Sequence, residues 1–464
     1  MTDTSWQPTL SGQQGPKYLA LSRALREAVR RGDLREGAQL PPVRDLAWRL
    51  GVTPGTVARA YQIGTQDGLL EAVVGRGTFV AGRVPQLGPT QALLVEPETA
   101  THLDLRAPHL PDVGQAAAIA EAMRAASAKI GAGYLDYPTL SSDRDLRARM
   151  VDWLGGDRLG ALGPDDIVLT QGGQNAIVLI LQCCLRGDRP VVFAEELAYA
   201  GFRHGARLCR AEIVPMALDA EGMVPEALDL ACRRHPGRVV CLTPQAQNPT
   251  AARMSAERRV AILRVARAHD LQVIEDDCYA VGGDSLPSLR LMAPDRVWHI
   301  SSLSKTVAAG LRFGILACPT GRGQAARVAA QHGSFGMSRV LVDTITELVV
   351  SGAAARIRDA VQSGFATRLG AALNRLGHHD VSWQPGLPFL WLRLPSGWRA
   401  STFARAAEAR GVLVRSSDVF ALVDSTAPNA VRLALSGTAP EARFTAGIDA
   451  LADLLDNPPR DMAV

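Results

Sequence analysis

The sequence predicts a multidomain protein, with a small N-terminal unit of three helices and a β-hairpin and a larger α/β domain that ends in a small α+β subdomain. At 464 residues the chain is too long for one hydrophobic core. A basic N-terminal segment and an alternation of strand-like and helix-like segments after it support this division. The expected boundaries are 1–82 for the first domain, 83–101 for a Pro-rich linker and 102–464 for the second domain, with its small subdomain from about residue 335.

Composition narrows the class of protein. The chain is 47% hydrophobic and 21% charged, and no apolar run reaches the roughly 20 residues that span a bilayer. The N-terminal stretch lacks the charged-then-apolar pattern of a secretion signal, so we expect a cytoplasmic protein without membrane contact. The seven cysteines include no CxxC pair, which predicts buried free thiols and no metal site.

Positive charge is concentrated near the N-terminus. Residues 17–83 hold eleven basic and six acidic side chains, a net charge of +5, whereas the whole chain carries +4. A small basic unit attached to a nearly neutral body indicates contact with a polyanion.

This basic segment is expected to form three helices and a hairpin. Apolar residues recur at helical spacing over 17–31, and Pro42 opens a second helix that ends at Gly51. Thr53 and Pro54 form a typical helix start, because Thr caps free N–H groups and Pro is preset for the first turn. Two short strands are expected at 71–74 and 77–81.

Helices and a hairpin in this order are typical of a winged helix-turn-helix, whose third helix enters the major groove of DNA. Arg44 is then placed to reach a phosphate, and Arg59 lies further along the recognition helix. Gly75, Arg76 and Gly77 form the wing tip, where Arg suits a narrow minor groove. The alternative is a small helical domain with a solvated basic face.

The basic segment also carries family motifs. G-x-x-L-P-x-x-R-x-L-A, L-G-V-T, T-V-x-R-A-Y and G-x-G-T-F-V occur in order, and the segment resembles the GntR-family winged helix over nearly its whole length. The resemblance implies that Arg44, Thr53, Thr56 and Gly77 face double-stranded DNA. Pro54-Gly55 departs from the polar or basic residues common there. Gly64 stands where this family usually has an apolar residue. A glycine at this position indicates either a helix break or a close backbone contact.

Strand-like and helical runs alternate after residue 102. The strand-like runs are DIVLT, PVVFAE, RVVCLTP, LQVIEDD and VWHISS. Amphipathic runs such as ERRVAILRVARAHD lie between them. This alternation indicates a parallel sheet wrapped by helices.

Lysine is rare in this chain, since only Lys17, Lys129 and Lys305 occur among 50 basic residues. Arg occupies nearly every position where only a positive charge is needed. The few remaining lysines are therefore more often at positions where Arg could not replace them. A guanidinium stays protonated, whereas an amine can lose its proton and form an imine. Lys305, in S-S-L-S-K after a strand, is the candidate; the alternative is a surface lysine.

Two other motifs suggest a bound anionic ring. The glycines of TQGGQNA (170–176) let backbone N–H groups close on an anion at a helix start, although many such turns look alike. Asp276 ends a buried strand, where a carboxylate needs a cation. A protonated pyridine nitrogen would supply one, and capping of the next loop is the alternative.

Together these motifs resemble the fold-type I pyridoxal 5′-phosphate enzymes, the aminotransferase class I/II family, over roughly 102–455. The resemblance implies that Lys305, Asp276 and Tyr279 are catalytic. It implies that Gly173, Gln174, Ser302, Ser304 and Arg312 bind the phosphate, that Tyr199 stacks on the ring, and that Asn248 and Tyr279 bond its phenolic oxygen. It also implies that Asp276 pairs with the ring nitrogen, that Arg432 binds a substrate carboxylate, and that Tyr137 reaches the neighbouring subunit's phosphate in a homodimer.

Two motifs depart from this family. ELAYAGF, around Tyr199, replaces the more usual D-P-x-Y-x-G, and Ser142 replaces a common Gly after Tyr137.

A GntR-like winged helix joined to an aminotransferase-like domain resembles the MocR subfamily of bacterial transcription regulators. The resemblance implies that an incoming amine or amino acid displaces Lys305 to form an external aldimine, and that the winged helices then change their spacing on DNA. One alternative is a functional aminotransferase with a fused winged helix, since the residues for transamination are retained. Another is a repressor with an inactive body. Effector, operator and direction of regulation stay open, with amino acids, GABA-like or taurine-like amines and free cofactor as candidate effectors.

Overall fold

The computed structural model describes residues 6–10, 16–66, 69–73, 76–81, 101–279, 286–422, 425 and 427–458. The chain divides into two compact units, of which the first is N-terminal. Apart from residue 101, the expected linker at 83–101 lies outside the described residues, and so does Gly75 of the expected wing tip.

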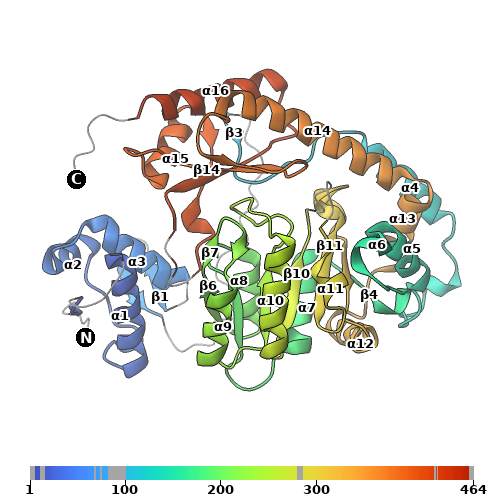
Figure 1. The fold of residues 1–464 in the computed structure, drawn as a ribbon, viewed down its shortest axis with the longest axis horizontal. Coiled ribbons are helices and arrows are strands. Elements are labelled where there is room, and N and C mark those ends of the chain that lie inside the picture. Colours follow the sequence, from blue (N-terminus) through green and yellow to red (C-terminus); the bar gives the residue numbers. More distant parts are fainter. Residues whose placement is uncertain are drawn as a thin grey trace. The chain divides into compact units, whose positions relative to one another are not determined.

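The N-terminal unit has the predicted elements (Figure 1). They are α1 (Lys17–Arg31), α2 (Val43–Leu50), α3 (Pro54–Gln66) and an antiparallel hairpin of β1 (Leu70–Val73) and β2 (Gly77–Val80). Thr53 precedes α3, and its Oγ1 accepts the Thr56 N–H at 3.4 Å, as expected of a cap. Tyr61 on α3 donates its hydroxyl to the Pro41 carbonyl at 2.9 Å, which ties α3 to the start of α2.

Gly64 lies inside α3, so it does not break the helix. A Cβ built on Gly64 would lie 2.8 Å from Leu70 Cδ1 and 3.0 Å from Leu25 Cδ2. Both leucines are buried in the core of this unit. Of the two interpretations of this glycine, the close contact is therefore the one that the structure supports.

The larger unit is built on a seven-stranded sheet in the order β4-β12-β11-β10-β9-β5-β6 (Figure 1). Its strands are β4 (Ile167–Thr170), β5 (Val191–Glu195), β6 (Glu212–Met216), β9 (Val239–Leu242), β10 (Gln272–Asp276), β11 (Val297–Ser302) and β12 (Gly314–Ala317). The helices of this part are α5 (Arg144–Leu154), α6 (Gly156–Leu159), α7 (Gly173–Cys184), α8 (Ala200–Leu208), α9 (Pro225–Arg234), α10 (Ala256–Ala268), α11 (Leu289–Met292) and α12 (Gly323–Ser334). Apart from most of the edge strand β6 and the two end residues of β10, the residues of these strands are buried, as expected of a sheet covered on both faces.

One strand departs from the parallel arrangement. β12 runs antiparallel to both of its neighbours, β11 and β4. The connection from β11 to β12 contains only two short 3-10 turns, at Leu303–Lys305 and Ala309–Leu311. A parallel crossover needs a dozen or more residues, so this short connection reverses the chain.

The small subdomain is α+β, as predicted. It has helices α13 (Arg339–Val350), α14 (Ala353–Leu376), α15 (Ala400–Ala409) and α16 (Glu441–Asp456), and a sheet in the order β13 (Val381–Ser382), β14 (Phe389–Arg393), β17 (Ala430–Ala434) and β16 (Arg415–Ser416). Two segments from the start of the domain adjoin it: α4 (Gln115–Ser127) packs on α13, and β3 (Leu103–Asp104) pairs with β15 (Val412–Leu413). The sequence did not predict that pairing. Among the described residues, no helix is both long and apolar enough to cross a bilayer.

We predict that Gly64→Ala destabilises the N-terminal unit by about 1–2 kcal/mol, because the added methyl group would overpack the core against Leu25 and Leu70. The free-energy cost of overpacking should exceed the gain of about 1 kcal/mol that replacing Gly by Ala normally brings within a helix. Gly55→Ala in the same helix is the matched control, since its Cβ would meet only Thr53 Oγ1 at 3.9 Å. Hydrogen exchange of α3 amides in the full chain measures both, and equal protection in the two variants would contradict the packing argument.

Candidate functional site

Several predicted site residues follow strands of the large sheet. Gly173 begins α7 after β4, Asp276 ends β10, and Ser304 and Lys305 follow β11. In an α/β sheet, ligands bind outside the carboxyl ends of the strands, where loops meet. The topology therefore brings together groups that are up to 132 positions apart in the chain, from Gly173 to Lys305.

A phosphate-sized cradle lies at the start of α7. Gly172 has a φ of +84°, and a Cβ on it would lie 2.7 Å from Arg312 Nη2. Arg312 donates to the Gln171 carbonyl at 3.4 Å. The backbone at Gly172 thus approaches a guanidinium closely, which only glycine allows. Exposed N–H groups at a helix start and a nearby Arg suit an anion.

The two serines before Lys305 differ in their contacts. Ser302 Oγ donates to the Phe313 carbonyl at 3.0 Å and accepts the Ser304 N–H at 3.1 Å, so it shapes the turn. Ser304 Oγ is buried and has no hydrogen-bond partner among the described residues. A buried hydroxyl without a partner is unusual in a folded protein, and it indicates a place for a ligand oxygen.

Lys305 is nearly buried, and its Nζ makes no hydrogen bond or ion pair among the described residues. Burial lowers the pKa of the Lys305 amine, and the positive charges of Arg432 and Arg312 lower it further. The neutral, nucleophilic amine is therefore favoured. A cavity of ≈ 350 Å³ lies beside Lys305, and its other lining residues come from 108–116 and 304–309.

Tyr199, Gln174 and Asp276 are close neighbours. A Cβ on Gly201 would lie 2.1 Å from both Gln174 Oε1 and Tyr199 Cε1, so the two side chains meet at this glycine. Burial raises the pKa of Tyr199 to about 12, with the charge of Asp276 adding to the effect. Burial also raises the pKa of Asp276, whose carboxylate accepts the Cys278 N–H at 3.1 Å. A carboxyl group in this state would be stabilised by a cationic partner.

Arg432 is the centre of a third group of contacts. Its Nη1 donates to Asn248 Oδ1 at 2.7 Å and its Nη2 to the Arg106 carbonyl at 2.8 Å. Asn248 Nδ2 donates to the Tyr279 hydroxyl at 3.5 Å. Burial lowers the pKa of Arg432 to about 10, and its Nε has no hydrogen-bond partner among the described residues. This buried cation is suited to bind an anion.

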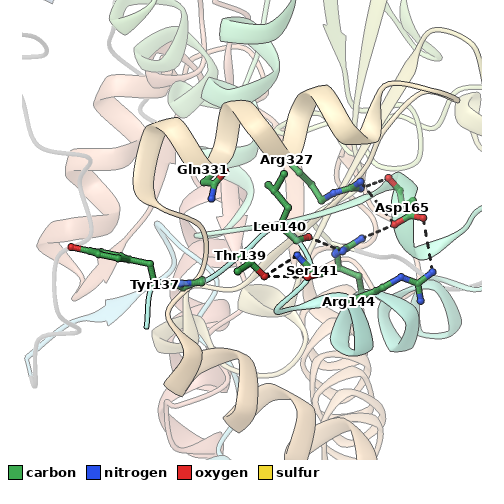
Figure 2. A pocket seen from close by; sticks show the side chains of 10 residues that line it. Tyr137, Thr139, Leu140, Ser141, Arg144, Asp165, Arg327 and Gln331 are labelled. Carbon is green, nitrogen blue, oxygen red and sulfur yellow. Dashed lines mark hydrogen bonds and ion pairs between the residues drawn. The ribbon is translucent and has the colours of Figure 1, made fainter. Parts of the chain in front are cut away.

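Tyr137 is the predicted site residue that this chain does not bring to Lys305. It is 78% exposed and lines a separate cavity of ≈ 630 Å³ beside Arg144 and Arg327, both of which approach Asp165 (Figure 2). Ser142, which departs from the family pattern, accepts the Thr139 N–H at 2.8 Å in the same turn. The position of Tyr137 matches its expected role only if a second subunit is present.

The residues expected to face DNA lie on the helices and hairpin of the first unit. Arg44 and Thr53 are exposed, and the Thr53 and Thr56 hydroxyls are 3.0 Å apart. Arg59 lies over the Tyr18 ring, 4.3 Å from its centroid. The Arg76 carbonyl accepts a hydrogen bond from Gln39 Nε2 at 2.8 Å, next to Gly77 with its φ of +114°.

The sequence reasoning missed a clamp formed by Glu195 and Gln247. Gln247 Nε2 donates to Glu195 Oε2 at 3.1 Å and to the Leu197 carbonyl at 2.6 Å, and Gln247 Oε1 accepts the Thr250 N–H at 2.9 Å. The clamp therefore joins the turn before Tyr199 to the turn that holds Asn248. Its only sequence signal was a Glu at the end of a strand expected to be buried.

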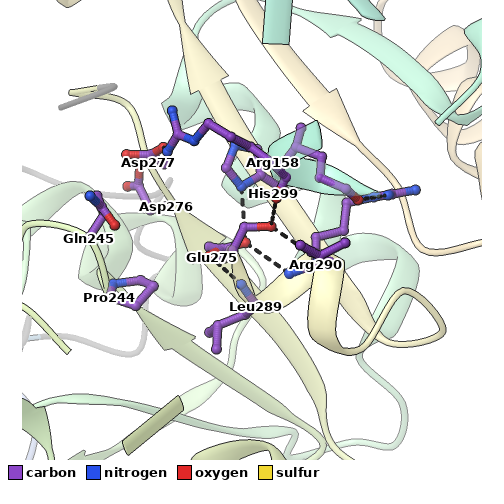
Figure 3. A network of polar contacts seen from close by, with 12 residues as sticks. Arg158, Pro244, Gln245, Glu275, Asp276, Asp277, Leu289, Arg290 and His299 are labelled. Carbon is purple, nitrogen blue, oxygen red and sulfur yellow. Dashed lines mark hydrogen bonds and ion pairs between the residues drawn. The ribbon is translucent and has the colours of Figure 1, made fainter. Parts of the chain in front are cut away.

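A second missed network lies beside Asp276 (Figure 3). Glu275 accepts the backbone N–H groups of Leu289 and Arg290 and lies 3.0 Å from His299 Nδ1. Asp277 pairs with Arg158 at 3.3 Å, and burial raises its pKa to about 6. Successive side chains of a strand point to opposite faces, so Asp276 points away from the face of Glu275 and contacts other groups.

Comparison with known proteins agrees with this architecture. Residues 103–446 match the family described as aminotransferase class I and II, and residues 17–80 match the bacterial regulatory proteins of the gntR family. The chain belongs to the aminotransferase class I and II family. Its N-terminal domain is a gntR-type winged helix, as the motifs predicted.

Two relatives of this two-domain aminotransferase-family protein are named as transcription regulators. The uncharacterized HTH-type transcriptional regulator YdeF of Bacillus subtilis is 29% identical over 98% of this chain and 97% of its own length. The vitamin B6 salvage pathway transcriptional repressor PtsJ of Salmonella typhimurium is 29% identical over 89% of this chain and 93% of its own length. The LysN α-aminoadipate aminotransferase of Thermus thermophilus, complexed with N-(5′-phosphopyridoxyl)-L-leucine, is 25% identical with a TM-score of 0.66, over 77% of this chain and 92% of its own.

Pyridoxal 5′-phosphate is the cofactor of this fold, and the residues present fit it. Gln174 Oε1, Ser304 Oγ and Arg432 Nε are buried and lack hydrogen-bond partners among the described residues. Glycines at 172 and 201 let the side chains of Arg312, Gln174 and Tyr199 lie close to the backbone, where a Cβ would clash with them. These polar atoms belong to residues that surround the Lys305 amine and the Asp276 carboxyl group.

We predict a pH-dependent difference between Glu195→Gln and the wild type. Burial raises the pKa of Glu195 from 4.5 to about 7, so its contribution to stability is full below about pH 4.5 and is lost as the pH rises through 7. Gln cannot ionise, and the free energy of unfolding of the variant relative to the wild type should rise by on the order of 2 kcal/mol from pH 5 to pH 8. Thermal unfolding across this range measures the change.

The matched control for this prediction is Glu212→Gln, an exposed glutamate on the adjacent strand β6. It should show no such pH-dependent difference. A constant offset between Glu195→Gln and the wild type at every pH would contradict the assignment of a raised pKa to Glu195.

Proposed function

We propose that this protein is a transcription regulator that carries pyridoxal phosphate on Lys305 and changes its DNA binding when an amine replaces Lys305. The observation that carries the proposal is a partly buried lysine, without a hydrogen bond or ion pair among the described residues, in a chain that also has a gntR winged helix. The family membership of the larger domain and the helix-turn-helix relatives support it.

The chain's own residues suit reversible attachment. Bound pyridoxal phosphate supplies an aldehyde carbon that bonds to one amine at a time. Lys305 can attach and leave, because its surroundings favour the neutral amine. We assign the phosphate to Gly173, Gln174, Ser304 and Arg312, with Ser302 shaping the turn. We assign the ring nitrogen to Asp276, the ring face to Tyr199, and the phenolic oxygen to Asn248 and Tyr279.

Arg432 points to the class of effector. A guanidinium with a free Nε inside a buried site favours an anionic group such as a carboxylate or sulfonate. The effector that fits is therefore a small primary amine that also carries such a group. The aldehyde carbon and Arg432 would bind its two ends.

The larger assembly is a homodimer on an operator. Tyr137 is exposed in one chain, which supports its assignment to the phosphate site of a second subunit. Two winged helices then read two half-sites, with Arg44, Thr53, Thr56, Arg59, Arg76 and Gly77 facing DNA. A protein that acts on an operator works where the chromosome is, which in a bacterium is the cytoplasm.

Lys305→Ala should keep operator binding but lose its response to effector, because no amine remains to be exchanged. In the wild type, one member of a panel of amino acids, GABA, taurine and pyridoxal phosphate should change operator affinity by about fivefold or more. Fluorescence anisotropy with the protein's own promoter fragment measures both. Lys129→Ala, an exposed lysine paired with Glu347, is the matched control and should respond like the wild type.

A turnover assay with an amine and a keto acid, together with detection of covalently bound cofactor, separates regulation from catalysis when it is run beside this titration. Multiple turnover of an amine with a keto acid, together with no affinity for the promoter fragment, would show a true aminotransferase and end the regulatory proposal. A lack of covalent cofactor in the wild type would support a repressor with an inactive body.

Arg44→Ala should weaken binding to all DNA sequences alike, because one phosphate contact is lost. The slope of the logarithm of the binding constant against the logarithm of the salt concentration should become shallower by about one. Titration of operator and unrelated DNA at several salt concentrations measures this. The matched control is Arg31→Ala, since Arg31 on α1 pairs with Glu27 at 2.7 Å. Loss of affinity for the operator alone would instead indicate that Arg44 contacts a base.

A further inference from the structure

Two consecutive histidines and an aspartate meet in the small subdomain, away from the residues assigned to the cofactor. His378 and His379 follow α14, and Asp456 is the last residue of α16. One donor atom from each side chain lies within 4.8 Å of the others. We propose that His378, His379 and Asp456 bind one transition-metal ion of the zinc class. The sequence-based expectation of no metal site considered cysteine spacing and not this histidine pair.

The distances favour a shared ion over direct hydrogen bonds. Asp456 Oδ1 lies 3.6 Å from His378 Nε2 and 3.4 Å from His379 Nε2. Both separations exceed the usual 2.7–3.2 Å of a hydrogen bond. Ligand atoms held at about 2.0–2.1 Å from a tetrahedral zinc ion lie about 3.3 Å from one another. The carboxylate oxygen is thus close to the position that such an ion requires relative to both imidazoles.

His379 gives an independent indication. Its side chain is only 14% exposed, and its Nε2 is buried without a hydrogen-bond partner among the described residues. A buried ring nitrogen without a partner is unusual.

The helix ends around the cluster favour a cation, and the types of ligand atom favour a transition metal. The carbonyl ends of α14 and α16 meet here, and the partial negative charge at helix C-termini favours a cation. Arg375 on α14 pairs with Asp449 on α16 at 2.9 Å, so the two helices are held together before an ion arrives. Two imidazoles and one carboxylate suit Zn²⁺, Co²⁺ or Ni²⁺, whereas Mg²⁺ and Ca²⁺ prefer oxygen ligands. Water would complete the coordination.

The test uses the full-length, cofactor-loaded protein after treatment with a chelator. Calorimetric titration with Zn²⁺ and visible spectroscopy with Co²⁺ should show one ion per chain and the absorption of tetrahedral cobalt. His379→Ala and Asp456→Asn should each weaken binding about tenfold or more. Zn²⁺ should also raise the thermal midpoint of the wild type but not of these variants.

The matched control is His269→Ala, because His269 Nε2 bonds Asp229 directly at 2.7 Å and belongs to no such cluster. It should bind the ion like the wild type. Circular dichroism checks that each variant is folded, and Asp456→Asn keeps the shape of the side chain. No binding by the wild type, or equal binding by the wild type, His379→Ala and Asp456→Asn, would overturn the proposal, and the latter result would place the ion at another site. The outcome is independent of the Lys305 proposal, since the cluster shares no residue with that cavity.

Discussion

Concentration of positive charge around Lys305 is the constraint on which the larger domain depends. Lys305 and Arg312 are close in the chain, Arg432 is far from both, and the charges of the two guanidinium groups act on the Lys305 amine. Removing cations from water is costly unless they find partners, and Arg432 donates to neutral groups such as the Asn248 amide and the Arg106 carbonyl. The site therefore limits its positive charge by favouring a neutral amine on Lys305. The guanidinium groups of Arg312 and Arg432 stay charged and can attract an anion.

The acidic residues near this edge show how strongly local partners decide what a carboxyl group can do. Glu275 has a lowered pKa, because hydrogen bonds and the charge of His299 outweigh the effect of burial. Asp276 and Asp277, the next two residues, have raised pKa values because burial dominates there. Only Asp276 shares its surroundings with Tyr199. Asp276 therefore lies beside Tyr199. Glu275 and Asp277 instead bind neighbouring groups of the fold, which include His299 and Arg158.

Local sequence predicted much of this protein, because caps, breakers and motifs act over a few residues. The start of α3 at Pro54, the position of Lys305 after a strand, and the glycine turn before α7 could all be predicted in this way. Contacts between distant segments could not be predicted from local sequence. Nothing near Gln247 indicates that its amide bridges Glu195 and Leu197, and nothing near Leu103 indicates its pairing with Val412. The sequence analysis predicted β11 but not β12, so it also did not predict the reversal of direction at the short connection between them.

The pairing of β3 with β15 has a mechanical consequence. Leu105 donates its N–H to Leu413 and accepts the N–H of Ala434, and the next carbonyl, on Arg106, accepts a hydrogen bond from Arg432. The first few residues of the larger domain are therefore hydrogen-bonded to the strand that carries Arg432. A displacement of the Arg432 side chain would pull directly on the backbone at residue 106. The peptide groups of residues 105 and 106 would thus be the first part of the domain's main chain to move with that side chain.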